Sequence, residues 1–295
     1  MKNTYSEMNK AVVGLFLGGK TLLAGKVKGG KIEKSVDVKI NNRADEDDII
    51  AELIQAITQV IDDEVIGIGI GVPSLVDESK GIVYKAQNIP SWKEVHLKEI
   101  LEHQFGLKTY VNNDANCFAV GELYFGSAAG YENIVGLIIG TGVGAGVIFK
   151  GHLYSGGNCG AGEIGAIPYM EHDYEYYLCD SYFDEKYGLQ SKKVISRATK
   201  KDKIALAIME QYGYHLGDLI KTLMYAYDPE MIVIGGPLSK SFPFFEKYMW
   251  KRINSFQYPH LAKKIMVKVT EQENIAVMGA AALYFDAHNQ KLIKG

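Results

Sequence analysis

The chain has 295 residues, and its 32 lysine and arginine side chains nearly balance 35 aspartate and glutamate side chains, for a formal net charge of −3 at pH 7. This balance disfavours a nucleic-acid partner, because no excess of positive charge exists to neutralise phosphates. Hydrophobic residues make up 47% and charged residues 23% of the chain, values typical of a soluble globular protein, and the length favours two domains.

The sequence predicts neither secretion nor a membrane partner. Residues 1–10 are polar and lack the apolar core of a signal peptide. The longest uncharged stretch, residues 133–149, is interrupted by glycines and is shorter than the roughly 20 apolar residues of a spanning helix. The chain's three cysteines (Cys117, Cys159 and Cys179) are too few and too scattered for a disulfide framework. We therefore expect a cytoplasmic protein.

Two similar glycine-containing hairpins occur far apart in the chain. Residues 12–27 read as an apolar strand, a turn at Gly18-Gly19 and a second strand. Residues 134–148 repeat this pattern around Gly140-Thr141-Gly142. Each pair of strands alone is equally consistent with an ordinary hairpin whose glycines allow a tight turn. The repetition favours two duplicated α/β domains with glycine turns that a phosphate can approach closely.

Helices and strands alternate between the two hairpins. The predicted elements are a helix at residues 47–63, a strand at 65–72, a short helix at 97–104, a strand at 107–111 and a helix at 117–124. The strand at 107–111 runs directly into Asn112-Asn113-Asp114. Ligands of α/β sheets gather outside the carboxyl ends of strands, so we expect chemistry at this loop.

The second half begins with the repeated hairpin and continues with helices and strands. The predicted elements are a long helix at residues 202–226, a strand at 231–236 that ends in Gly235-Gly236, a strand at 265–270 and a helix of small residues at 274–285. The small residues suit this last helix to close packing.

These motifs, taken together with Gly162-Glu163-Ile164-Gly165, resemble the ROK family (repressor, open reading frame, kinase) of the actin-like, hexokinase-type ATPase superfold. The resemblance runs from about residue 12 to residue 284, with the motifs in the same order. It implies an α/β fold with two duplicated actin-like (ribonuclease H-like) domains that flank a ligand cleft. The implied domains are residues 1–112 and a larger domain of residues 113–274, and a helix at about 275–295 packs back onto the first. A homodimer is also implied.

The resemblance implies ATP-dependent phosphorylation of a hexose or an N-acylhexosamine, as in glucokinases and N-acetylmannosamine kinases. Asp114 is then the general base, and Asn113, Glu163 and Asn88 bind the sugar. From the residues alone, Asp114 is equally well explained as a helix cap. Glu163 could be a solvent-facing loop carboxylate, although its neighbouring glycines favour the functional role, and Asn88 is also explained as a turn residue.

The implied partners are ATP, with Mg²⁺, and a small-molecule sugar. The implied nucleotide-binding residues lie in the three glycine turns: Gly18, Gly19, Lys20, Gly140, Thr141, Gly142, Gly235 and Gly236. Lys20 would offset phosphate charge, although it is also explained as an ordinary surface lysine.

Three departures from the family pattern favour a second hypothesis. Phe16 stands where the family has an acidic residue that helps to hold Mg²⁺, and a benzyl group cannot coordinate a hard cation. Ala166 replaces a zinc-binding histidine that also touches the sugar, and Cys179 is the one cysteine left in the family's cluster of three. We therefore predict no zinc and no metal-ligating side chains, with Tyr174, Tyr176 and Tyr177 packed in that volume.

The second hypothesis is a non-catalytic regulatory protein, derived from the family, that binds a sugar or a nucleotide. A DNA-binding repressor is disfavoured, because only about ten residues precede the first strand, too few for a helix-turn-helix unit.

Overall fold

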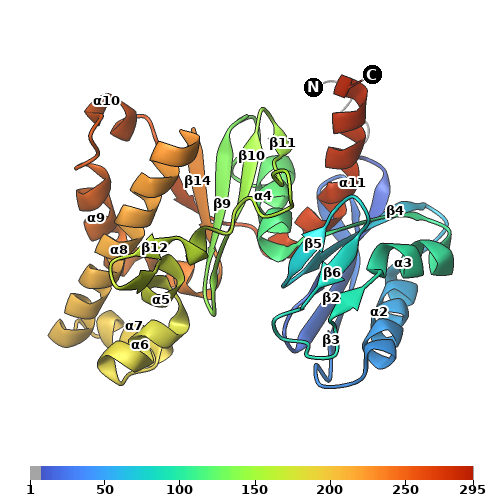
Figure 1. The fold of residues 1–295 in the computed structure, drawn as a ribbon, viewed down its shortest axis with the longest axis horizontal. Coiled ribbons are helices and arrows are strands. Elements are labelled where there is room, and N and C mark those ends of the chain that lie inside the picture. Colours follow the sequence, from blue (N-terminus) through green and yellow to red (C-terminus); the bar gives the residue numbers. More distant parts are fainter. Residues whose placement is uncertain (1–7, 295) are drawn as a thin grey trace. The chain divides into compact units, whose positions relative to one another are not determined.

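The computed structural model describes residues 8–294, with side chains described through residue 289. Residues 1–7, at the start of the predicted first domain, and residue 295, at the end of the predicted last helix, lie outside the described residues. The contacts divide the chain into two compact units (Figure 1). The first comprises the chain up to residue 130, residues 146–161 and the chain from residue 271 on, and the second comprises residues 131–145 and 162–270. Two separate clusters of buried apolar side chains form the cores.

The first unit contains a five-stranded sheet whose strand order is β3-β2-β1-β4-β8. Its strands are β1 (Ala11–Leu17), β2 (Thr21–Lys28), β3 (Lys31–Lys39), β4 (Val65–Val72) and β8 (Lys108–Asn113). β2 pairs antiparallel with β1 and β3, whereas β4 pairs parallel with β1 and β8. Because β1 and β4 are buried on both faces, they read as continuous apolar runs. The predicted strands of this half are confirmed.

Among the described residues, the helices of the first unit are α2 (Glu46–Val60), α3 (Leu97–Phe105), α4 (Asp114–Phe125) and α11 (Ile275–Lys294). A small sheet of β5 (Leu75–Asp77), β6 (Ile82–Tyr84) and β7 (Glu94–Val95) completes it. Helix α11 lies against β4 so closely that a Cβ atom on Gly69 would come 1.8 Å from the Ala280 carbonyl oxygen. Helix α4 packs on α11, so the first unit extends beyond residue 112, where the sequence predicts its end.

A second five-stranded sheet has the order β11-β10-β9-β14-β15. Its strands are β9 (Ile134–Ile139), β10 (Val143–Phe149), β11 (His152–Leu153), β14 (Met231–Gly235) and β15 (Met266–Val269). If the strands of each sheet are numbered in chain order, starting from the hairpin of that half, both sheets have the spatial strand order third, second, first, fourth, fifth. In both, the fourth strand is parallel to the first. The predicted duplication and the α/β class are confirmed.

The helices of the second unit are α5 (Tyr174–Leu178), α6 (Asp180–Tyr187), α7 (Ser191–Thr199), α8 (Lys203–Tyr227), α9 (Phe242–Ile253) and α10 (Pro259–Ala262). A hairpin of β12 (Pro168–Tyr169) and β13 (His172–Asp173) precedes them. The Asp202 side chain caps α8 by accepting a hydrogen bond from the Ala205 N–H, which explains why the long helix begins there. No helix within residues 8–294 is both long and apolar enough to cross a membrane.

Candidate functional site

Asp114 lies at the carboxyl end of β8, where α4 begins without an intervening loop. The Asn113 side chain caps the helix, and its Oδ1 accepts a hydrogen bond of 3.0 Å from the Asn116 N–H. Asp114 is partly exposed, and its Oδ1 accepts a hydrogen bond of 2.9 Å from the Ala115 N–H. The helix therefore starts earlier than the predicted residue 117, and its cap is Asn113. A helix N-terminus stabilises negative charge, so this position favours a carboxylate side chain.

Cys117 fixes how closely the first turn of α4 approaches the sheet. Its Sγ lies 3.9 Å from the Ile70 carbonyl oxygen, and a Cβ atom on Gly71 would come 3.0 Å from the same sulfur. Burial raises the pKa of the Cys117 thiol well above its usual range, and the charge of Asp114 adds to this effect. Cys117 is therefore a neutral packing residue, and it holds the helix that carries Asp114 close to β4.

The structure brings Asn88 against the first glycine turn. The turn between β1 and β2 is closed by a hydrogen bond of 2.7 Å from the Gly18 N–H to the Thr21 carbonyl. A Cβ atom on Gly19 would lie 3.2 Å from the Cβ of Asn88, and Asn42 donates a hydrogen bond of 2.7 Å to the Asn88 carbonyl. The predicted sugar ligand Asn88 thus contacts the predicted nucleotide turn, a neighbourhood that the sequence did not indicate.

Phe16 occupies the end of β1 beside this turn. Its ring lies 3.5 Å from the position of a Cβ atom on Gly18, and its strand partners are Leu23 and Gly71. Phe16, Leu23 and Gly71 have no side-chain oxygen, so they cannot ligate a hard cation such as Mg²⁺. Lys20 is exposed within the turn.

The two glycine turns of the second unit touch each other. Because β9 and β14 are parallel neighbours, their carboxyl ends bring Gly140 and Gly236 to the same edge of the sheet. A Cβ atom on Gly140 would come 2.8 Å from the Pro237 ring, and one on Gly236 would come 2.4 Å from the Ile139 carbonyl oxygen. Gly236 also has a φ of 87°, which favours glycine. Thr141 is exposed at the tip of the β9–β10 turn.

Glu175 supports this turn, and sequence reasoning did not identify it as a site residue. Its Oε2 accepts a hydrogen bond of 2.9 Å from the Val143 N–H and lies 2.9 Å from the position of a Cβ atom on Gly142. The Asp180 N–H donates to the Gly140 carbonyl at 2.7 Å. The start of α5 and the start of α6 therefore fix the turn from one side. No sequence signal marks these contacts, because they join residues more than 30 positions apart.

Glu163 is exposed beside Gly162, which has a φ of 95°. The segment packs on β10, because a Cβ atom on Gly165 would come 2.4 Å from the Val143 carbonyl oxygen. The predicted site residues thus form two sets. Asn88, Asn113, Asp114 and the turn of Gly18, Gly19 and Lys20 belong to the first unit. Glu163 and the turns at residues 140–142 and 235–236 belong to the second.

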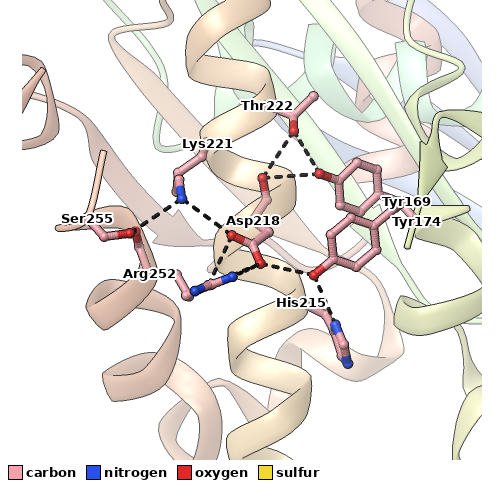
Figure 2. Close-up of polar contacts among 8 residues, drawn as sticks. All are labelled: Tyr169, Tyr174, His215, Asp218, Lys221, Thr222, Arg252 and Ser255. Carbon is pink, nitrogen blue, oxygen red and sulfur yellow. Dashed lines mark hydrogen bonds and ion pairs between the residues drawn. The ribbon is translucent and has the colours of Figure 1, made fainter. Parts of the chain in front are cut away.

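A cluster of tyrosines, among them Tyr174 and Tyr177, packs around His215. Tyr169 stacks on Tyr174 with ring centroids 4.3 Å apart, and Tyr177 lies 4.8 Å from the His215 ring. Figure 2 shows the polar side of the cluster, where Asp218 of α8 accepts hydrogen bonds from Tyr169 and from Arg252. Among the residues whose side chains are described, no group of three or more His, Cys, Asp or Glu is placed to hold a metal ion.

The neutral imidazole of His215 makes hydrogen bonds with two tyrosine hydroxyls. Tyr169 donates to Asp218 at 3.0 Å, so its oxygen is left to accept from Nδ1 of His215 at 3.2 Å. Nε2 of His215 then accepts from Tyr182 at 3.3 Å. The pKa of His215 is lowered to about 4, chiefly by burial; the charge of Asp218 opposes this shift, and the charges of Arg252 and Lys186 contribute to it.

We expect this histidine to make the protein less stable in acid. Between pH 6.5 and pH 4 the unfolded chain binds a proton that folded His215 refuses, so the free energy of unfolding falls as the pH falls, by up to about 3 kcal/mol. Urea unfolding at pH 7 and pH 4.5 checks this. Between pH 7 and pH 4.5, the free energy of unfolding of His215→Gln should fall by about 2 kcal/mol less than that of the wild type. His260→Gln, at an exposed histidine of the same unit, should behave as the wild type does. Equal losses in all three proteins would contradict the assignment.

Comparison with known proteins gives matches over most of the chain. A model of the ROK family matches residues 12–287. The glucokinase of Halalkalibacterium halodurans is 28% identical over 318 residues, which cover 94% of this chain and 96% of that protein. The xylose repressor of Bacillus spizizenii is 31% identical over 214 residues, which cover 66% of this chain and 54% of the repressor.

A crystal structure gives a similar result for the fold. The ROK family glucokinase from Streptomyces griseus, solved in complex with glucose and AMPPNP, superposes with a TM-score of 0.78 at 23% identity and covers 92% of this chain and 98% of that one. This match confirms the predicted α/β fold of two duplicated actin-like domains.

Proposed function

Because the chain belongs to the ROK family, we propose that it is an ATP-dependent sugar kinase that phosphorylates a hexose or an N-acylhexosamine. The observation that carries the proposal is the partly exposed carboxylate of Asp114 at the carboxyl end of β8, directly after Asn113. The glucokinase relative, which this chain matches over nearly its whole length, supports the same activity.

In the proposed reaction, Asp114 accepts the proton of a sugar hydroxyl as that oxygen attacks the γ-phosphorus of ATP. A bond forms between the sugar oxygen and phosphorus, the bond from phosphorus to the β–γ bridging oxygen breaks, and ADP leaves with that electron pair. Asn113, Glu163 and Asn88 would hold the sugar through its other hydroxyls.

The glycine turns would bind the nucleotide. Turns that lack Cβ atoms, as at Gly140, Gly142 and Gly236, let backbone N–H groups approach phosphate oxygens. Lys20 would add positive charge. Bound Mg²⁺ would neutralise phosphate charge, but the end of β1 presents Phe16 where a carboxylate ligand is expected, so we assign no protein ligand to it.

A second candidate is a non-catalytic protein that binds a sugar or a nucleotide. Phe16 favours it, because losing the acidic residue removes a cation ligand from the centre where the phosphoryl group is transferred. The match to the xylose repressor shows that the family also contains regulators. Calorimetric titration with ATP and with sugars, followed by turnover assays, separates the two candidates.

The experiment that tests the proposal is an ADP-release assay over a panel of hexoses and N-acylhexosamines in the presence of Mg²⁺. We expect at least one sugar to stimulate ADP release well above the rate with ATP alone. Binding of a sugar without stimulation by any sugar or divalent cation would favour the non-catalytic candidate.

A further inference from the structure

Glu78 connects the end of β8 with the loop that follows β11. Its Oε2 accepts a hydrogen bond of 3.2 Å from Nδ2 of Asn112 and a short hydrogen bond from the Ser155 hydroxyl. Asn112 and Ser155 are both buried, with 5% and 7% of their surfaces exposed. Neither the sequence motifs nor the proposed chemistry assigns a role to Glu78.

The turn that carries Glu78 is closed by its own hydrogen bonds. Asp77 Oδ1 accepts hydrogen bonds from the Ser79 hydroxyl at 2.7 Å and from the Lys80 N–H at 3.1 Å. The Gly81 N–H donates to the Asp77 carbonyl at 2.6 Å, and Gly81 has a φ of 65°. Glu78 is therefore presented from a closed turn between β5 and β6, and its carboxylate has a defined position.

Glu78 determines which way the Asn112 amide faces. Oδ1 of Asn112 accepts hydrogen bonds from the Asn113 N–H and from Nδ2 of Asn116, both at 2.8 Å. The opposite orientation would place the Asn112 NH₂ group against these two donors and its oxygen against the Glu78 carboxylate. An ionised carboxylate can only accept, so it selects the orientation in which Asn112 donates to it.

The orientation of the Asn112 amide bears on Asn113 and Asp114, the two neighbouring residues of the proposed site. The Asn112 oxygen holds the backbone N–H of Asn113 and the side chain of Asn116 in the first turn of α4. Asn116 Oδ1 is buried without a hydrogen-bond partner among the described residues, which shows that its amide orientation is dictated by Asn112 at the expense of its own acceptor. Asp114 lies between these two fixed residues.

Ser155 connects a second segment of the chain to the Glu78 carboxylate through its hydroxyl. It lies in the loop after β11, and the Ala161 N–H closes this loop by donating to the Ser155 carbonyl at 3.1 Å. Anchoring Ser155 therefore anchors the start of the loop that leads along the chain to Glu163.

We propose that Glu78 is a positioning residue for the phosphoryl transfer, which holds Asn113 and Asp114 in place through the amide of Asn112. This inference rests on the proposed function. Glu78 itself need not touch either substrate, so its removal should affect the chemical step more than the binding of ATP.

The test compares Glu78→Ala with Glu78→Gln. Alanine removes the acceptor, whereas the amide oxygen of glutamine can accept from both Asn112 and Ser155. We expect Glu78→Ala to lower kcat about 10- to 100-fold with the KM for ATP unchanged, because small displacements of a catalytic group have effects of this size. Glu78→Gln should retain most of the wild-type kcat. Glu99→Ala is the matched control, at a glutamate of the same unit whose side chain is 81% exposed.

A second readout keeps the inference separate from the proposed activity. Amide hydrogen exchange at Asn113 should be faster in Glu78→Ala than in the wild type and unchanged in Glu78→Gln, because the Asn112 oxygen protects this N–H. If the wild-type protein turns over no sugar, the proposed function fails, and the exchange result still decides whether Glu78 orders the strand end. Unchanged exchange in Glu78→Ala would overturn the inference. So would equal losses of kcat and melting temperature in both variants, since these would indicate a purely structural role.

Discussion

Replacing Asp114 with asparagine is expected to lower kcat by about 10²- to 10⁴-fold, the range over which a general base contributes. Asparagine has nearly the same size and keeps an oxygen that can accept from the Ala115 N–H, as Asp114 does at 2.9 Å. It cannot take up the proton of a sugar hydroxyl. The variant should therefore fold and bind ATP as the wild type does, and steady-state assays should show the loss in kcat.

Asp45→Asn provides the matched control for this substitution. Asp45 also stands at the start of a helix in the first unit, and its side chain makes no capping hydrogen bond. We expect its kcat to equal that of the wild type. A wild-type rate for Asp114→Asn, measured with the sugar that gives the highest turnover, would remove Asp114 from the mechanism.

The second large effect is expected on the free energy of unfolding, for a glycine substitution where α4 and α11 cross. A Cβ atom on Gly279 would come 1.8 Å from the Cys117 carbonyl oxygen, and one on Gly121 would come 2.8 Å from the Ile275 carbonyl oxygen. Both obstacles are backbone atoms, so the two helices would have to separate. We expect Gly279→Ala to lower the free energy of unfolding by about 3 kcal/mol, at the upper end of the cost of overpacking.

Urea unfolding of Gly279→Ala and Gly157→Ala measures this effect. Gly157 lies in the same unit at a position where a Cβ atom would meet open space, so its substitution should change stability little. Because α4 carries Asp114, Gly279→Ala should also lower kcat at temperatures where it remains folded. A stability loss no larger than that of Gly157→Ala would mean that the helices do not pack this closely.

The parts of the fold that the sequence predicts are those with a local pattern. β1 and β9 are apolar runs that end in glycine turns, and α2 shows apolar residues at helical spacing, so each can be recognised within a short window. The sequence predicts the start of α4 too late, because residues 115–122 are all buried and the helix has no polar face to reveal its period.

The parts that the sequence does not predict depend on contacts between distant residues. The Tyr-rich segment of β12, β13 and α5 has no regular period, and its packing depends on His215 of α8, which lies 46 positions from Tyr169. Glu78 and Asn112 are 34 positions apart, and nothing in either local sequence indicates that they meet. The role proposed for Asp114 rests on its motif, whereas the hydrogen bond between Glu78 and Asn112 beside it does not follow from the sequence.

The most direct measurement of the central claim is the quantity of sugar phosphate formed by the purified protein. The wild type, incubated with ATP, Mg²⁺ and the sugar that best stimulates ADP release, should form sugar phosphate and ADP in equal amounts over many turnovers, as mass spectrometry can quantify. The contradicting result is that sugar and ATP both bind, but ADP forms only at the rate of slow hydrolysis and no phosphorylated sugar forms at any protein concentration. This result would show that the family fold is retained here without phosphoryl transfer.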